Sequence, residues 1–342
     1  MKPIELPPNQ QHHFYAGGPR IARFRGVESA DDQAPEDWVG SVTPMFGQSE
    51  RGLSRLDDGR LLSEALAADP EAFLSPDHLA RYGADPALLV KLLDAGQRLP
   101  VHVHPTREFA RRHLSCPYGK SEAWVVLEAR EGAEVHLGFR SDVAEDQLAG
   151  WVRRQDTAAV LGALHALPVS EGDAVFVPAG MPHAIGEGIL VVELQEPTDF
   201  SVLLEWDGFG LDGTTDGHLG LGFDVALGCV DRSGWAVEAL EELRAERADN
   251  EDGGVRRLLP PVADTFFRAE RIRPQGGAAR ADEGLAILVV VDGDGVLRSR
   301  GGDLVLRRGQ TVLAPHAAGE LLLEGSVDIV VCRPPAPEIA AP

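Results

Sequence analysis

The chain has 342 residues, 44% of them hydrophobic and 25% charged, which is ordinary for a globular protein with room for two or three cores. A formal net charge of −22 argues against a nucleic-acid partner, since that partner requires a basic surface. No apolar run is long enough to span a bilayer, and the N-terminal residues lack the basic, apolar pattern expected of a secretory leader. Three separated cysteines without a C-x-x-C pair are typical of a reduced cytoplasmic protein.

The first third of the chain predicts a mixture of helices and strands. Residues 61–73 have the apolar spacing of an amphipathic helix, and the apolar run at 87–94 fits either a short helix or a strand. Residues 99–103 predict a strand, and 106–113 predict a helix capped by Thr106. Trp38 is expected either in the core or lining a cleft.

The middle of the chain alternates in a way that is typical of strands around a helical insertion. Residues 124–128 and 134–139 predict paired strands, and 142–164 predict helices. Strands are expected again at 173–177 and 189–195. Because strand side chains alternate between faces, Glu193 and Gln195 are expected to point the same way, into a barrel.

The remaining chain predicts a loop, a helix and an all-β unit. Residues 208–222 hold six glycines and are expected to cover the mouth of a pocket. Residues 235–247 predict an acidic amphipathic helix, and 266–333 predict short strands joined by glycine-rich turns. The Pro/Ala-rich tail at 334–342 is expected to be loose.

One group of residues points to a divalent metal. His102 and His104 lie two apart on a predicted strand and therefore share a face, Glu122 follows, and the spacing G-x5-P-x-G-x2-H at 172–183 ends in His183. Three imidazoles and a carboxylate form a typical metal-ligand set, although paired histidines can also be purely structural.

This combination resembles the two motifs of the cupin superfamily. The resemblance implies a mainly β fold of two jelly-roll barrels with an α-helical insertion. We expect residues 1–60, 95–140 and 170–225 to form a metal-binding barrel, residues 61–94 and 141–169 to be helical, and residues 226–342 to form a second, metal-free barrel.

Lysine is rare in this sequence, which draws attention to the positions that have kept it. Only Lys2, Lys91 and Lys120 are lysines among 32 basic residues. A lysine ammonium changes its pKa readily when buried, whereas an arginine guanidinium stays charged. We therefore expect Lys91 and Lys120 to lie in the pocket, although chance retention is the simpler alternative.

Several segments together resemble the type I phosphomannose isomerases (mannose-6-phosphate isomerases). They are Glu-x-Trp38, Leu-Val-Lys91-Leu-Leu, Val-His104-Pro105, Gly119-Lys120-Ser-Glu122-Ala-Trp124 and Pro178-Ala-Gly180-Met-Pro-His183. The resemblance implies His104, Glu122 and His183 as ligands of zinc, with Lys91, Lys120 and Glu193 around a sugar. The chain departs from the family at His102, where the family has a glutamine ligand, and at Leu203, where it has a catalytic arginine.

The expected activity is metal-dependent isomerisation of a hexose or hexose phosphate through an enediol, with Lys120 and Glu193 as catalytic residues. Lys91 and Trp38 are expected to bind the sugar, and His102, His104, Glu122 and His183 to bind one divalent ion, zinc. The alternatives are an isomerase or iron-dependent oxygenase acting on a non-phosphorylated substrate, and a non-catalytic sugar-binding cupin. Neither nucleic acid nor a membrane is an expected partner.

Overall fold

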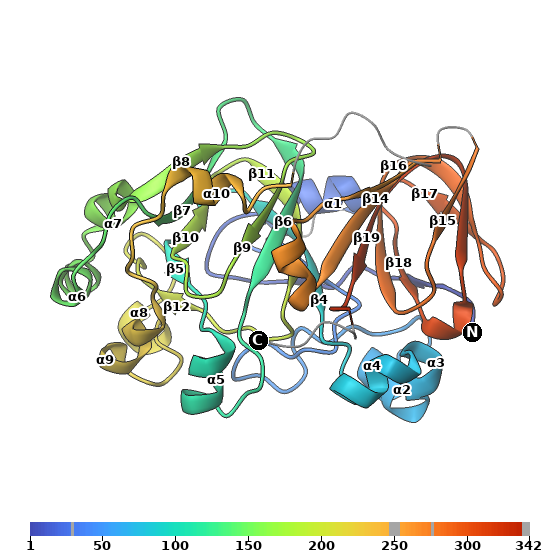
Figure 1. Ribbon diagram of the computed structural model, residues 1–342, viewed down its shortest axis with the longest axis horizontal. Coiled ribbons are helices and arrows are strands. Elements are labelled where there is room, and N and C mark those ends of the chain that lie inside the picture. The colour runs from blue at the N-terminus through green and yellow to red at the C-terminus, as the bar shows by residue number, and fades with distance from the viewer. Residues whose placement is uncertain (29–30, 246–253, 275–276, 337–342) are drawn as a thin grey trace.

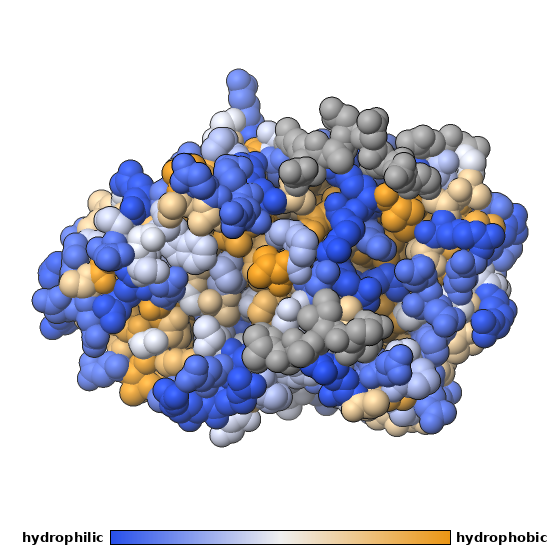
Figure 2. All heavy atoms as spheres, in the orientation of Figure 1, coloured by the Kyte–Doolittle hydropathy of each residue, from blue (hydrophilic) through white to orange (hydrophobic). Residues whose placement is uncertain are grey.

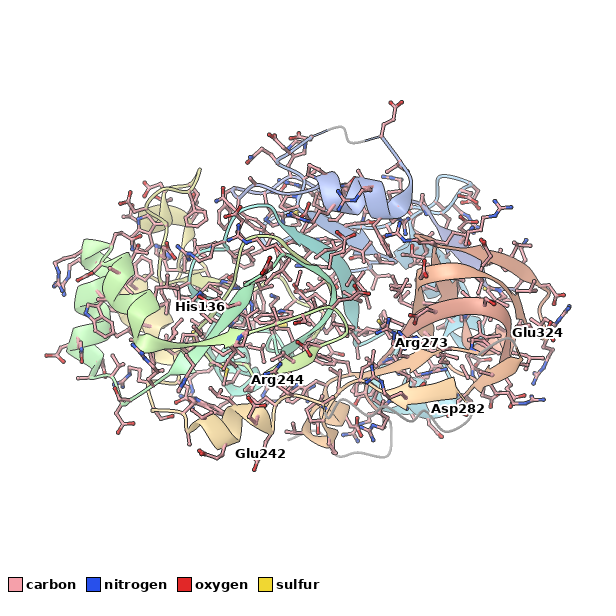
Figure 3. The ribbon with its side chains drawn as sticks, turned by 90° about the horizontal axis from the view of Figure 1, so that it is seen from above. His136, Glu242, Arg244, Arg273, Asp282 and Glu324 are labelled. Carbon is pink, nitrogen blue, oxygen red and sulfur yellow. The ribbon has the colours of Figure 1, made fainter. Side chains whose placement is uncertain are left out.

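A computed structural model of the chain describes residues 1–28, 31–245, 254–274 and 277–336. Within these ranges the strands form sheets of six, five and eight strands, so the protein is mainly β (Figure 1). Seen from above, His136 of the five-stranded sheet and Glu324 of the eight-stranded sheet lie in opposite halves of the molecule (Figure 3).

The six-stranded sheet carries the longest buried apolar strands of the first half. Its strands run in the order β2 (Gln10–Gln11), β3 (Glu36–Val39), β4 (Leu89–Ala95), β11 (Ile189–Gln195), β6 (Glu122–Ala129) and β9 (Ala174–Val177). All neighbours are antiparallel. Every residue of β4 and β11 is buried, which explains their nearly continuous runs of Leu, Ile and Val.

The five-stranded sheet brings distant histidines together. Its order is β12 (Val202–Leu203), β5 (His102–Val103), β10 (His183–Ile185), β7 (Glu134–Phe139) and β8 (Leu164–Pro168). Side chains of this sheet, such as Leu137 and Ile185, share one hydrophobic core with those of the six-stranded sheet. The two sheets therefore pack together around the region that contains the predicted ligands.

The eight-stranded sheet has a core of its own. Its order is β1 (Ile4–Leu6), β18 (Thr311–Ala314), β16 (Ala286–Arg298), β19 (Leu321–Arg333), β14 (Arg268–Ile272) and β13 (Val255–Arg257), with β15 (Ala278–Ala281) on β19 and β17 (Leu304–Arg307) on β16. Residues such as Leu288, Leu323 and Ile329 form this second cluster. The predicted all-β unit at 266–333 is confirmed.

Short helices join and flank the sheets. They are α1 (Pro19–Arg25), α2 (Leu62–Ala68), α3 (Pro70–Phe73), α4 (Pro76–Tyr82), α5 (Arg107–His113), α6 (Glu145–Arg154), α7 (Thr157–Ala163), α8 (Gly213–Asp216), α9 (Phe223–Ala226) and α10 (Val237–Glu241). The predicted helix at 106–113 and its cap are confirmed, because the Thr106 side chain accepts from the backbone N–H of Phe109. The helical insertion near 142–164 is confirmed as α6 and α7.

Some expected boundaries are wrong, each for a local physical reason. The helix at 61–73 is broken between α2 and α3, where Asp69 caps α3 and Pro70 cannot donate to the preceding turn. The helix at 235–247 is only α10, and residues 246–247 lie outside the described residues. The tail expected at 334–342 also lies outside them from residue 337 onward.

Tertiary pairing overturns other expectations. β6 and β7 pair with different strands rather than with each other, since β6 lies between β11 and β9, and β7 between β10 and β8. Residues 61–94 and 141–169 are not wholly helical, because β4 and β8 are strands. Residues 1–60 do not all join the first two sheets, since β1 pairs with β18. These pairings link segments far apart in sequence, which local patterns do not reveal.

One face of the molecular surface is mostly hydrophilic (Figure 2). Hydrophilic residues cover much of this face, and smaller hydrophobic patches lie between them (Figure 2). Among the described residues, no helix has the length and apolar character needed to cross a membrane.

Candidate metal centre

Three histidine side chains converge where β5 and β10 lie side by side. His102 pairs directly with His183 in the strand register, and His104 follows on the same side of the chain. The ring centroids of His102 and His183 are 4.2 Å apart, and each lies 4.9 Å from that of His104. One nitrogen from each ring lies within 4.8 Å of the others. The predicted histidine cluster is therefore assembled.

A backbone carbonyl fixes the orientation of each of the three rings. Each Nδ1 lies within hydrogen-bond distance of a carbonyl oxygen: His102 with Pro100 at 2.8 Å, His104 with Phe200 at 2.7 Å and His183 with Met181 at 2.8 Å. A carbonyl only accepts, so each Nδ1 carries the hydrogen and each Nε2 keeps its lone pair. Among the described residues, nothing hydrogen-bonds to the buried His183 Nε2. Such anchoring by Nδ1–H is typical of metal-binding histidines.

Glu122 adds a carboxylate to the histidine cluster. Its Oε2 lies 3.0 Å from His104 Nε2, and its Oε1 lies 3.3 Å from His183 Nε2. The Trp124 indole donates to Oε1 at 2.9 Å, which orients the carboxylate. Glu122 begins β6 and its side chain is buried. Glu122 therefore lies against two of the three histidines, His104 and His183.

The electrostatics of the cluster favour the protonation states that bind metals. Burial lowers the pKa of His102 well below its usual value, with further repulsion from the other imidazoles. Burial and the nearby Lys120 ammonium lower the pKa of His104 to about 3. Burial opposes ionisation of Glu122, but Lys120 and the imidazoles outweigh it and hold the pKa well below its usual value. Neutral imidazoles and an ionised carboxylate suit a divalent cation.

Lys120 adjoins this group. Its Nζ lies 2.8 Å from His104 Nε2 and donates to Glu122 Oε2 at 2.8 Å. The side chain is buried, and it lines the same cavity as His102 and His104. The prediction that Lys120 lies in the pocket is confirmed, and so is that for Lys91.

A row of residues runs across the adjacent six-stranded sheet, and two of them, Lys91 and Glu193, line the cavity. Trp38, Lys91, Glu193 and Trp124 pair in register along β3, β4, β11 and β6. Lys91 Nζ lies 3.0 Å from Glu36 Oε2 and 4.0 Å from Glu193 Oε1. Burial opposes the charge on Lys91, but Glu36 and Glu193 raise its pKa above the ordinary value. Lys91 therefore stays cationic, and Glu36 lies closer to it than Glu193 does.

Glu193 is a buried carboxylate with few compensating contacts. Its Oε1 lies 3.7 Å from Lys120 Nζ and, among the described residues, has no hydrogen-bond partner. Burial and repulsion from Glu122 raise the pKa of Glu193 to about 7, although Lys120 and Lys91 act in the opposite direction. A buried carboxyl that titrates near neutral pH and opens into a cavity is suited to proton transfer.

The expectation that Trp38 binds the sugar is wrong. Glu36 is a residue of this region to which the sequence analysis gave no role. Trp38 is fully buried and is not among the cavity-lining residues, so it does not reach a ligand there. Its ring instead lies 4.5 Å from Lys91 Nζ, a cation–π contact, and its indole donates to Glu36 at 2.7 Å. Glu36 also accepts from the Tyr15 hydroxyl at 2.5 Å. The Glu-x-Trp spacing on a strand was the available signal.

These residues surround a cavity of about 730 Å³. Part of its lining comes from residues 210–220, as predicted for the glycine-rich segment, with Leu211, Thr215 and Leu219 among them. Leu203 of β12 also lines it, next to His102 in the strand register. A volume of this size is typical of small-molecule sites.

The sheet arrangement and the buried histidine cluster define a metal-binding protein of the cupin fold. A family model described as the cupin domain of mannose-6-phosphate isomerase matches residues 262–334. The sequence is 25% identical to a probable mannose-6-phosphate isomerase, GmuF, of Bacillus subtilis, over 97% of this chain and 99% of that protein. The chain is therefore similar to mannose-6-phosphate isomerases along almost its whole length.

Solved structures agree with this fold. The mannose-6-phosphate isomerase of Bacillus subtilis superposes with a TM-score of 0.77 at 22% identity, covering 97% of this chain and 100% of that one. A mannose-6-phosphate isomerase bound with zinc and yttrium superposes with a TM-score of 0.73 at 16% identity, covering 98% of this chain and 100% of that one.

Proposed function

We propose that the protein is a metal-dependent aldose–ketose isomerase that acts on a hexose or hexose phosphate, in the manner of mannose 6-phosphate to fructose 6-phosphate. The observation that carries this proposal is that Glu193 and Lys120 line the same cavity as His102, His104 and Glu122. The similarity of the chain to mannose-6-phosphate isomerases supports the same reaction.

His102, His104, Glu122 and His183 are the proposed ligands of one divalent ion, zinc. Their donor atoms fit such an ion, because the Nε2 atoms keep their lone pairs and His183 Nε2 has no other partner among the described residues. A solved structural neighbour bound with zinc supports this choice. When bound, the ion supplies Lewis acidity that polarises the carbonyl and the adjacent hydroxyl of the sugar.

The chain's own residues move the protons. The Glu193 carboxylate takes the proton from C2 of the aldose and returns it to C1. Lys120 gives a proton to the C1 oxygen and regains one from the C2 hydroxyl, so that the aldehyde becomes a ketone through an enediol. The Lys120 ammonium donates a hydrogen bond to the oxygen on which negative charge develops. The Lys91 ammonium holds the far end of the sugar, and Glu36 and Trp38 fix its position.

The donor set alone also fits an iron-dependent oxygenase, since it has three imidazoles and one carboxylate. The two buried lysines and the near-neutral Glu193 favour the isomerase, because proton transfer next to a carbonyl needs an acid–base pair. An oxygen-uptake measurement on the iron-loaded chain separates these reactions, and the isomerase proposal predicts no uptake.

The decisive experiment is a panel of phosphorylated and unphosphorylated aldoses, incubated with the zinc-loaded full chain in deuterated water. We expect ketose formation with solvent deuterium incorporated at the carbon that receives the proton. Tight sugar binding without ketose or exchange across the panel would instead indicate a sugar-binding cupin without catalysis.

Two finer structural features belong to the same proposal. The six- and five-stranded sheets form one cupin barrel, and the eight-stranded sheet with its separate core forms a second barrel without a metal. Metal analysis is then expected to give one ion per chain. A cytoplasmic location is supported by three free cysteines, Cys116, Cys229 and Cys332.

A further inference from the structure

Both lysines that line the cavity are already balanced by carboxylates. Lys91 Nζ lies 3.0 Å from Glu36 and 4.0 Å from Glu193. Lys120 Nζ lies 2.8 Å from Glu122 and 3.7 Å from Glu193. Two ammonium groups therefore face three buried carboxylates. A phosphate dianion placed between Lys91 and Lys120 would have to compete with the carboxylates that already pair with both ammonium groups.

Apart from imidazoles, the one further cationic side chain among the described lining residues is Arg51. It is exposed, and its guanidinium donates to the backbone carbonyl of His12. His12 is also largely exposed and lies 3.0 Å from Asp31. This guanidinium belongs to the mouth of the cavity, where solvent weakens its attraction for an anion.

The wall next to the metal cluster is apolar and acidic. Leu203 is buried and pairs with His102, and its backbone N–H donates to Gly217 at 2.8 Å, which joins it to the segment carrying Leu211 and Leu219. The charged lining side chains of these segments are the carboxylates Asp199, which is half-buried, and Asp216, which is exposed and therefore acts more weakly. Apolar surface leaves a phosphate without donors, and carboxylates repel it.

We propose, resting on the isomerase function above, that the site selects an unphosphorylated aldose. C1 and C2 of the sugar lie beside Lys120 and Glu193. The neutral C5–C6 end offers its hydroxyls to Lys91 on one side and lies against Leu203, Leu211 and Leu219 on the other. A neutral sugar end meets this wall without the desolvation that a dianion requires.

The test compares free mannose with mannose 6-phosphate on the zinc-loaded full chain. We expect kcat/KM for free mannose to exceed that for the phosphate ester by at least about tenfold, since one contact to a charged group changes discrimination by that order. A higher kcat/KM for the ester would overturn the inference. Loss of that ester preference in Arg51→Gln would place the phosphate at the cavity mouth instead.

Calorimetric binding of the same two sugars separates this inference from the isomerase proposal. If no aldose of the panel turns over, the isomerase proposal fails. Tighter binding of free mannose would still support the selection, and tighter binding of the ester would refute it. Leu203→Arg should shift the kcat/KM or affinity ratio toward the ester by about tenfold to a hundredfold. The size-matched control Leu203→Met should keep the preference for the free sugar. An unchanged ratio in Leu203→Arg, with folding verified by thermal melting, would show that this wall does not set the selection.

Discussion

Glu193 is the residue at which a single isosteric change tests the proposed chemistry most sharply. Glu193→Gln keeps the size of the side chain and removes its basic oxygen. Because general-base catalysis contributes about 10²–10⁴ in rate, we expect kcat to fall by that factor, equivalent to about 3–5 kcal/mol of activation free energy. Retained zinc content in the variant would show that the metal cluster is intact.

The raised pKa gives the same variant a second signature. The base must be deprotonated, so with a pKa of about 7 the wild-type kcat/KM should fall about tenfold for each pH unit below 7. Burial raises the pKa of Glu193 from its ordinary value of 4.5. Between pH 4.5 and 7 the folded chain therefore binds more protons than the unfolded chain. The folded state loses stability as the pH rises through this window. At about 1.4 kcal/mol for each pH unit, the penalty reaches about 3 kcal/mol above pH 7.

Glu193→Gln has no such penalty, so the metal-free variant should be more stable than the wild type at pH 8, and the difference should vanish near pH 4. Steady-state kinetics and urea denaturation across pH check both effects. Glu128→Gln is the matched control, since Glu128 lies on β6, is half-buried and pairs with Arg23 at 2.8 Å. If Glu193→Gln lowers kcat less than tenfold, or if its stability advantage does not change with pH, the role assigned to Glu193 is wrong.

Other substitutions test separate parts of the structure. Lys120→Met should lower kcat/KM at least about a hundredfold with zinc content unchanged in metal analysis, and unchanged activity would contradict its role. His183→Ala should weaken zinc affinity at least about a hundredfold in a chelator competition, because it removes a buried Nε2 donor. Arg107→Leu should destabilise the chain by about 3–5 kcal/mol in urea denaturation, since it leaves Glu196, 2.6 Å from Arg107 Nε, buried and unpaired. Adding Glu196→Gln should recover part of that loss, and no recovery would refute the charge argument.

The sequence alone determined much of the metal cluster and of the elements that carry it. Two histidines at a spacing of two must share a face of a strand, and a glycine- and proline-bounded turn must redirect the chain before His183. The retention of lysine only at Lys2, Lys91 and Lys120 also carried information, because arginine serves equally well for most exposed charges. These signals are local in the sequence, so they do not depend on knowing which strands pair.

The tertiary structure alone decided which strands are neighbours and therefore which side chains share the cavity. The register of β3, β4, β11 and β6 places Lys91 beside Glu193 and turns Trp38 from an expected sugar contact into a support for Lys91. It also brings Leu203 next to His102, although about a hundred residues separate them in sequence. Pairing between distant strands depends on burying the apolar face of the whole sheet, a property that no single segment carries.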